Sequence, residues 1–219
     1  MHLIVILGAL ISISFTTTYL IASLRGRVKP NRITWLIWGI APLISTAASL
    51  STGVSWASLP VFMAGFGPIL VFIVSSFNKA AYWRIERFDY ICGLVSILAL
   101  VAWYLTKNPN VAISLAILSD ALAALPTMLK GWKYPETENG FLFLGSLFSA
   151  STSFTEIHHW NFAEVAFPIY LILLSLTMLF LIEGRRKYLN YKKVLVQVLF
   201  TNLSLKIRSD GNESLQKKV

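Results

Sequence analysis

The chain has 219 residues, of which 56% are hydrophobic and only 13% are charged, and its formal net charge is +9. Soluble domains carry about 25% charged residues, and charge-free runs such as 3–24 and 54–77 are as long as the ~20 apolar residues that cross a bilayer. A soluble globular protein is therefore excluded. We expect the first run to be retained as a helix, because no basic residue precedes it and further apolar runs follow.

Seven membrane-spanning helices are predicted in chain order. Such segments have to be helical, because lipid offers no hydrogen-bond partner to the backbone. The predicted limits are 3–24, 33–50, 54–77, 90–106, 110–129, 139–155 and 164–182. After the last of them the chain is basic, and its apolar stretch 194–205 is too short to span, so we expect a helix on the membrane surface there.

The basic residues predict the orientation. They follow the first, third, fifth and seventh predicted spans, and only Lys107 falls on the other side. Basic loops stay cytoplasmic, so we expect an inner or plasma membrane protein with its N-terminus outside and its C-terminus in the cytoplasm. The positive charge then marks topology and attracts anionic lipid at the cytoplasmic face. We do not expect nucleic-acid binding. The sequence does not decide whether the protein forms a homo-oligomer.

An internal repeat emerges when the chain is shifted by 105 residues. "SFTTTYLIASLRGRVKP" (14–30) then aligns without a gap with "SDALAALPTMLKGWKYP" (119–135). Both segments end in the pattern L-[RK]-G-x-x-x-P, where we expect Gly26 and Gly131 to end helices in the left-handed region. The predicted architecture is two parallel three-helix repeats joined by a linker helix. Its parts are 1–79, the loop and fourth helix 80–108, 109–186, and the basic tail 187–219.

This layout resembles the SWEET and PQ-loop (MtN3-like) superfamily of seven-helix membrane proteins. The local resemblance lies in "ALPTMLKGWKYPETENGFLFL" (124–144), which is similar to the PQ-loop pattern. Pro126 stands at the motif proline and Thr127 replaces the glutamine, whereas the first half departs from the motif with Ile21 and Ala22. The resemblance implies a transporter of a small polar metabolite, or a receptor built on the same fold.

Asp120 is the sharpest signal in the sequence, because it lies near the middle of the fifth predicted span. A charged Asp at the centre of a membrane helix costs about 2.5–3.5 kcal/mol on insertion scales. Such a residue serves either proton coupling or binding of a cationic or hydroxyl-rich substrate. The alternative is a structural hydrogen bond that holds two helices together. The sequence leaves both open.

Hydroxyl and aromatic side chains at similar depth are candidates to share a cavity with Asp120. Trp38 either stacks on a substrate ring or packs in the core, whereas Trp35, at the end of its span, is expected in the interfacial aromatic belt. Small hydroxyl residues line cavities but also join membrane helices. The candidate hydroxyls are Ser14, Thr17, Ser119 and Ser149.

Two prolines are candidate gates, because a proline inside a helix frees a carbonyl and permits a bend. They are Pro42 in the second predicted span and Pro126 in the fifth. The outer segment "TEIHHWNFAE" (155–164) offers His and Glu, but its adjacent histidines point in different directions, so no metal site is predicted. The single cysteine, Cys92, excludes a redox pair. We expect no cofactor and no enzymatic activity.

The sequence therefore predicts a facilitator or proton-coupled carrier that binds a small polar metabolite, such as a sugar or an amino acid, midway across the membrane. It would work by alternating access. The alternative is a non-transporting receptor or assembly protein that binds a peptide, lipid or protein partner, because a fold does not fix a function.

Overall fold

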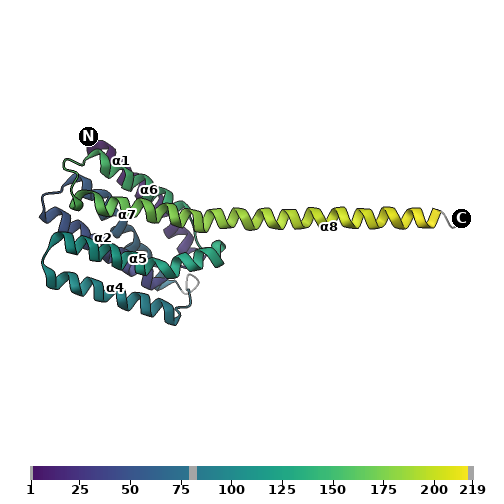
Figure 1. The fold of residues 1–219 in the computed structure, drawn as a ribbon, viewed down its shortest axis with the longest axis horizontal. Helices are drawn as coiled ribbons and strands as arrows, with labels where there is room; N and C mark the ends of the chain where they lie inside the picture. The colour runs from purple at the N-terminus through teal and green to yellow at the C-terminus, as the bar shows by residue number, and fades with distance from the viewer. Residues whose placement is uncertain (1, 79–82, 217–219) are drawn as a thin grey trace.

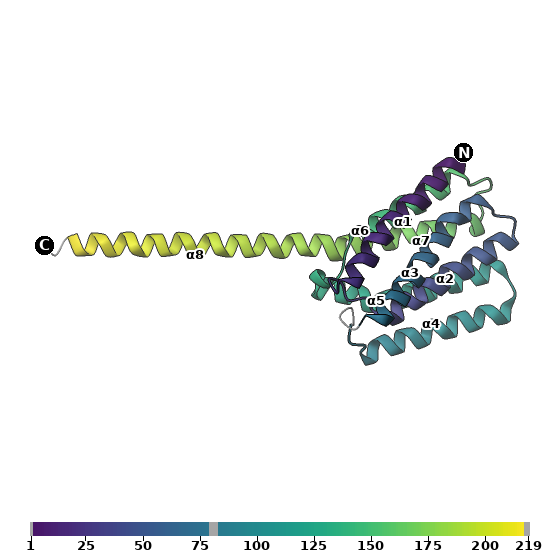
Figure 2. The same ribbon diagram turned by 180° about the vertical axis from the view of Figure 1, so that it is seen from behind.

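The structure is a computed structural model that describes residues 2–78 and 83–216, and within these it is all-helical, without a strand. Figures 1 and 2 show a helical bundle from which one long helix extends. The predicted domain limit between 79 and 80 and the last three residues of the predicted tail lie outside the described residues. The predicted all-helical class is confirmed.

The helices follow one another with short connections. Three-residue 3-10 turns lie at Trp56–Ser58, Pro135–Thr137 and Ser153–Thr155, and a π-helical turn, Phe180–Gly184, joins the last two helices. The helices are α1 (His2–Leu24), α2 (Arg32–Ser51), α3 (Leu59–Phe77), α4 (Arg87–Thr106), α5 (Pro109–Lys133), α6 (Phe141–Thr152), α7 (Phe162–Leu179) and α8 (Arg185–Gln216).

Five helical segments in the described part of the chain are long and apolar enough to cross a membrane. They are α1, α2, Trp56–Phe77, α5 and Phe162–Thr201, while α6 with its 3-10 end, Phe141–Thr155, is apolar but shorter. Large apolar side chains such as Leu7, Leu10 and Leu173 are exposed on the bundle surface. Exposed apolar surface on this scale is unusual for a soluble monomer. The helices are therefore compatible with an integral membrane protein.

Local sequence explains where the helices begin and end. The Asn31 side chain accepts from the backbone N–H groups of Ile33 and Thr34, which caps α2. Asn108 caps α5 in the same way, and Pro109 occupies its first turn. Gly26 ends α1 with φ of 66°, as predicted.

The expectation for Gly131 is wrong, because this glycine lies inside α5, which continues to Lys133. A Cβ at Gly131 would lie 3.0 Å from Cγ1 of Ile182. The glycine is thus needed for close approach of α5 to the end of the α7 segment and not for a left-handed turn. The repeated L-[RK]-G pattern consequently serves two different structural purposes.

Six helices form a closed ring around a common interior. Following the packing contacts from one helix to the next gives the order α1, α3, α2, α5, α7, α6 and back to α1. α4 packs outside this ring, mainly against α5 and also against α2, and Figures 1 and 2 show it at the edge of the bundle. The interior is therefore reached by side chains from all six ring helices.

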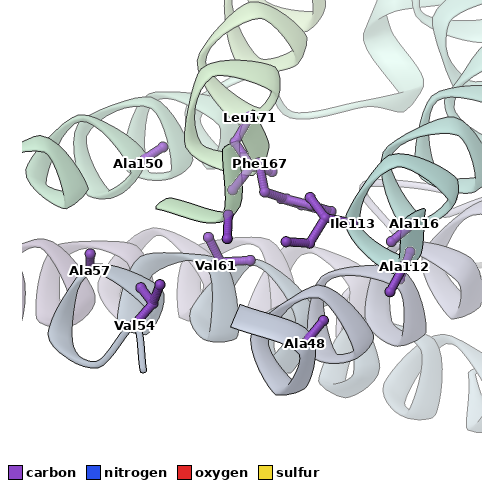
Figure 3. Packing of buried hydrophobic residues seen from close by; sticks show 12 residues of the cluster. Ala48, Val54, Ala57, Val61, Ala112, Ile113, Ala116, Ala150, Phe167 and Leu171 are labelled. Carbon is purple, nitrogen blue, oxygen red and sulfur yellow. The ribbon is translucent and has the colours of Figure 1, made fainter. Parts of the chain in front are cut away.

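Two apolar clusters fill the ring at different heights. The alanine-rich cluster contains residues from the end of α2 to the start of α3 together with α5 and α7, among them Ala48, Val61, Ile113 and Phe167 (Figure 3). The aromatic cluster contains Tyr19, Trp35, Trp38 and Phe143 with aliphatic side chains of α7, and lies toward the end of the bundle that carries the basic loops. We call this end, where α1 finishes and α2 begins, the basic end.

α8 continues the direction of α7 beyond the bundle as one long helix (Figures 1 and 2). The apolar stretch predicted at 194–205 is part of this helix and does not form a separate surface helix. Between residues 190 and 201 its side chains are exposed, including Val194, Leu199 and Phe200.

Candidate functional site

A cavity lies inside the ring, between the alanine-rich and the aromatic clusters. All six ring helices contribute to its wall, and in the described part of the chain α4 contributes nothing. Its polar wall residues are Ser12, Thr16, Asp120, Ser146, Ser149 and Ser175, and its aromatic ones are Trp35, Trp38 and Phe143. We call it the central cavity.

The central cavity is small. Its volume is about 50 Å³, which is room for roughly three to five water molecules, whereas pockets for drug-sized ligands have about 300–1,000 Å³. Asp120 stands near the middle of α5, and Ser12 and Pro42 near the middle of α1 and α2. The cavity thus lies halfway along the bundle.

Asp120 is almost completely buried, with 1% of its surface exposed. Its Oδ2 accepts a hydrogen bond of 2.7 Å from the Tyr170 hydroxyl of α7. Its Oδ1 is buried without a hydrogen-bond partner, and the residue lines the central cavity. A buried carboxylate oxygen without a donor is costly, so a donor brought to this atom would stabilise it.

Trp38 also reaches the cavity, as predicted among the candidate residues. Its Nε1 donates to the backbone carbonyl of Asp120 over 3.2 Å, which ties α2 to α5. Its ring lies edge-on to Phe143 at 5.9 Å and to Trp35 at 5.5 Å between centroids. Trp35 is fully buried, so its expected place in an interfacial belt is wrong. Its Nε1 has no partner and it lines the same cavity.

The predicted hydroxyl residues divide into two groups. Ser149 lines the central cavity, with a buried Oγ that has no partner. Ser14 and Thr17 do not line it: both are exposed, and their hydroxyls donate to the carbonyls of Leu10 and Ile13 in their own helix. A hydroxyl that bonds one turn back is satisfied even on an outward face.

Ser119 is buried but lies outside the cavity. Its carbonyl accepts from the Ser96 hydroxyl of α4 over 2.9 Å, and its own Oγ has no partner. It therefore belongs to the contact between α5 and α4. Of the two candidate gates, Pro42 lines the cavity, whereas Pro126 is buried in α5 outside the cavity wall.

The basic end of the ring is closed by a buried polar network that the sequence did not reveal. Lys130 of α5 and Glu138, before α6, form an ion pair with both side chains at most 1% exposed. The Tyr19 hydroxyl of α1 donates to Oε2 of Glu138 over 2.6 Å, and Nζ of Lys130 also donates to the carbonyl of Lys29. The Trp83 ring lies 4.7 Å from the same ammonium.

The opposite end is held by fewer polar contacts between helices. Ser49 of α2 donates to the carbonyl of Ala163 of α7 over 3.1 Å. His2 contacts Glu156 over 3.0 Å. Glu164 accepts from the backbone N–H groups of His158 and His159, so it orders the loop before α7.

Within the described residues, no group of three or more His, Cys, Asp or Glu is placed to hold a metal ion.

Of the residues that the sequence reasoning missed, Tyr170 gave a usable signal and Lys130 did not. Tyr170 is an isolated phenol in the apolar run of α7, and a buried tyrosine hydroxyl usually has a partner. Lys130 was visible only as a loop charge, because its burial depends on the position of Glu138.

The chain matches no protein-family model, and it has no significant similarity to a curated protein or to a solved structure.

Proposed function

We propose that this protein is a membrane transporter, a facilitator or proton-coupled carrier, that moves a small polar metabolite by alternating access around the central cavity. One observation carries the proposal: a cavity halfway along the bundle is lined by six helices and by three residues that each have a buried polar atom without a partner. The residues are Asp120, Trp35 and Ser149. Unsatisfied polar atoms in a purely structural core would be a net cost.

The proposed architecture has seven membrane-spanning helices in two parallel repeats, as in the SWEET-like layout. The packing order supports it, because a shift of 105 residues carries α1, α2 and α3 onto α5, α6 and α7. Under this shift the contacts α1–α3, α2–α3 and α2–α5 correspond to α5–α7, α6–α7 and α6–α1, and all six pairs pack together. Trp38 and Phe143, which contact each other edge-on, correspond to one another as well.

The basic end faces the cytoplasm in this proposal, in an inner or plasma membrane, so that the N-terminus lies outside. A surface pocket at this end, between α1 and α6, is lined by Arg25, Arg27 and Arg186 together with apolar side chains such as Phe141. Arg186 is already paired with Glu183. The other two support an attraction to anionic lipid headgroups.

Movement of the two ends would open the cavity to each side in turn. At about 50 Å³ the cavity offers little space, so loading of a substrate requires the helices to separate. At the basic end the Tyr19–Glu138–Lys130 network has to break. At the other end the alanine-rich cluster has to separate, and Pro42 is placed at the cavity to permit bending of α2.

The proposal is tested by measuring the efflux of labelled sugars, amino acids and amines from liposomes that contain the purified protein. We expect saturable efflux of at least one solute, lost in Ser149→Phe, which fills the cavity. The matched control is Ser14→Phe, the same change on an exposed face, and it should keep the efflux. Absence of saturable efflux for every solute, or equal efflux in both variants, would contradict transport.

A second candidate function is a receptor or assembly protein. The observation that favours it is α8, which extends beyond the bundle with exposed apolar residues around Val194–Phe200. A helix of this kind suits a protein partner. Removal of residues 190–219 separates the two functions, because it should leave efflux intact in a transporter and abolish partner binding in a receptor.

A further inference from the structure

The polar wall of the central cavity has one charged member. Asp120 is acidic, and among the described wall residues there is no Lys, Arg or His. The hydroxyl of Tyr170 satisfies Oδ2 but brings no positive charge, and Oδ1 has no donor. A carboxylate in a low-dielectric interior is stabilised most by an opposite charge with hydrogen-bond donors. A cationic ligand would therefore complement the wall of the cavity.

The aromatic wall suits the same ligand. Trp35, Trp38 and Phe143 all line the cavity. The Trp38 ring lies edge-on both to Trp35 and to Phe143. Ammonium groups are attracted to the faces of such rings, most strongly to Trp. A cation beside the face of one of these rings would gain from the ring as well as from the carboxylate.

The remaining unpaired atoms describe the rest of the ligand. Nε1 of Trp35 is a buried donor without an acceptor, and Oγ of Ser149 is a buried hydroxyl without a partner. A hydroxyl group on the ligand would accept from one and bond to the other. A carboxylate on the ligand, as in an amino acid, would meet no positive charge and would lie in the same cavity as Asp120.

We propose that the central cavity binds a small amino alcohol in its ammonium form, with the ammonium at Oδ1 of Asp120 and the hydroxyl toward Trp35 and Ser149. This rests on the proposed transport function and names its substrate class. The volume of about 50 Å³ holds roughly four groups of the size of a water molecule. Ethanolamine has that many non-hydrogen atoms. Sugars and amino acids, which the sequence left open, are disfavoured.

The test is the thermal unfolding of the purified full chain in detergent with four probes: ethanolamine, ethylene glycol, glycine and glucose. Ethylene glycol has the shape of ethanolamine without its charge, and glycine adds a carboxylate. A ligand that binds only the native state raises the melting temperature with concentration. We expect ethanolamine alone to do so, and Asp120→Asn to weaken its apparent affinity at least tenfold.

The matched control is Asp89→Asn, since Asp89 is also buried but lies at the start of α4, away from the cavity. It should keep the ethanolamine response. If Asp120→Asn does not fold, the comparison of ethanolamine with ethylene glycol on the unaltered chain decides alone. Equal shifts with both compounds, a larger shift with glycine or glucose, or no shift with ethanolamine would each overturn the proposal.

The liposome assay separates this outcome from failure of the proposed function. Saturable efflux of glucose or glycine without an ethanolamine response would overturn the amino-alcohol assignment and leave transport standing. Absence of efflux for every solute, with an ethanolamine shift that Asp120→Asn removes, would leave the binding site standing and overturn transport.

Discussion

The ion pair of Lys130 and Glu138 gives the sharpest stability prediction. Both side chains are at most 1% exposed, and removing one partner of such a pair leaves a buried charge, which costs about 3–5 kcal/mol. In Glu138→Gln the ammonium keeps the carbonyl of Lys29 and the Trp83 ring. We therefore expect a loss near the lower limit, about 3 kcal/mol in the free energy of unfolding.

Lys130→Met should cost a similar amount, because it leaves the Glu138 carboxylate with Tyr19 as its side-chain donor. The double variant Lys130→Met/Glu138→Gln removes both charges, and contacting residues are not additive. We expect it to lose at least ~1.5 kcal/mol less than the sum of the single losses.

The assay is reversible unfolding in mixed micelles, followed by tryptophan fluorescence. Lys133→Met is the matched control, because Lys133 lies on the same helix but is exposed, and it should change stability by no more than about 0.5 kcal/mol. Single losses below about 1 kcal/mol that add up in the double variant would refute the reasoning, because the pair would then behave like an exposed one.

Two further changes test the packing around the cavity. Tyr170→Phe removes the donor to Oδ2 of Asp120, and we expect a loss of about 1–3 kcal/mol in the same unfolding assay; unchanged stability would show that the bond is not formed. Gly65→Ala places a Cβ 2.8 Å from the carbonyl oxygen of Gly39, and we expect a loss of about 1–3 kcal/mol from overpacking. Gly184→Ala, where the nearest atom is 3.5 Å away, should be neutral, and equal losses in the two glycine variants would contradict the close approach of α2 and α3.

The sequence predicted much of the fold because membrane helices are long, apolar and separated by charges. Each predicted span falls on a helix, although α6 is short. The error at Gly131 has a physical cause: glycine serves both left-handed helix ends and close helix packing, and only the neighbouring Ile182 distinguishes them. The continuous α8 was missed because apolar length alone does not show that a helix continues from the preceding one.

The site was predicted in part, for reasons of helix rotation. Asp120 was identified by its cost in lipid, and Trp38 by its depth, and both line the cavity. Ser14 and Thr17 have the right depth but face outward, because a hydroxyl can bond within its own helix. Depth can be read from a sequence, whereas the direction of a side chain around the helix axis depends on the neighbouring helices.

In the proposed transport cycle the cavity opens to both sides of the membrane in turn. The most direct measurement is the reaction of Ser149→Cys with a membrane-impermeant thiol reagent in proteoliposomes, with Cys92 replaced by alanine. We expect reaction from either side, protection by the transported solute, and much slower reaction of Ser14→Cys, which lies on an outward face. No reaction of Ser149→Cys from either side, or an equal rate at both positions, would contradict this cycle.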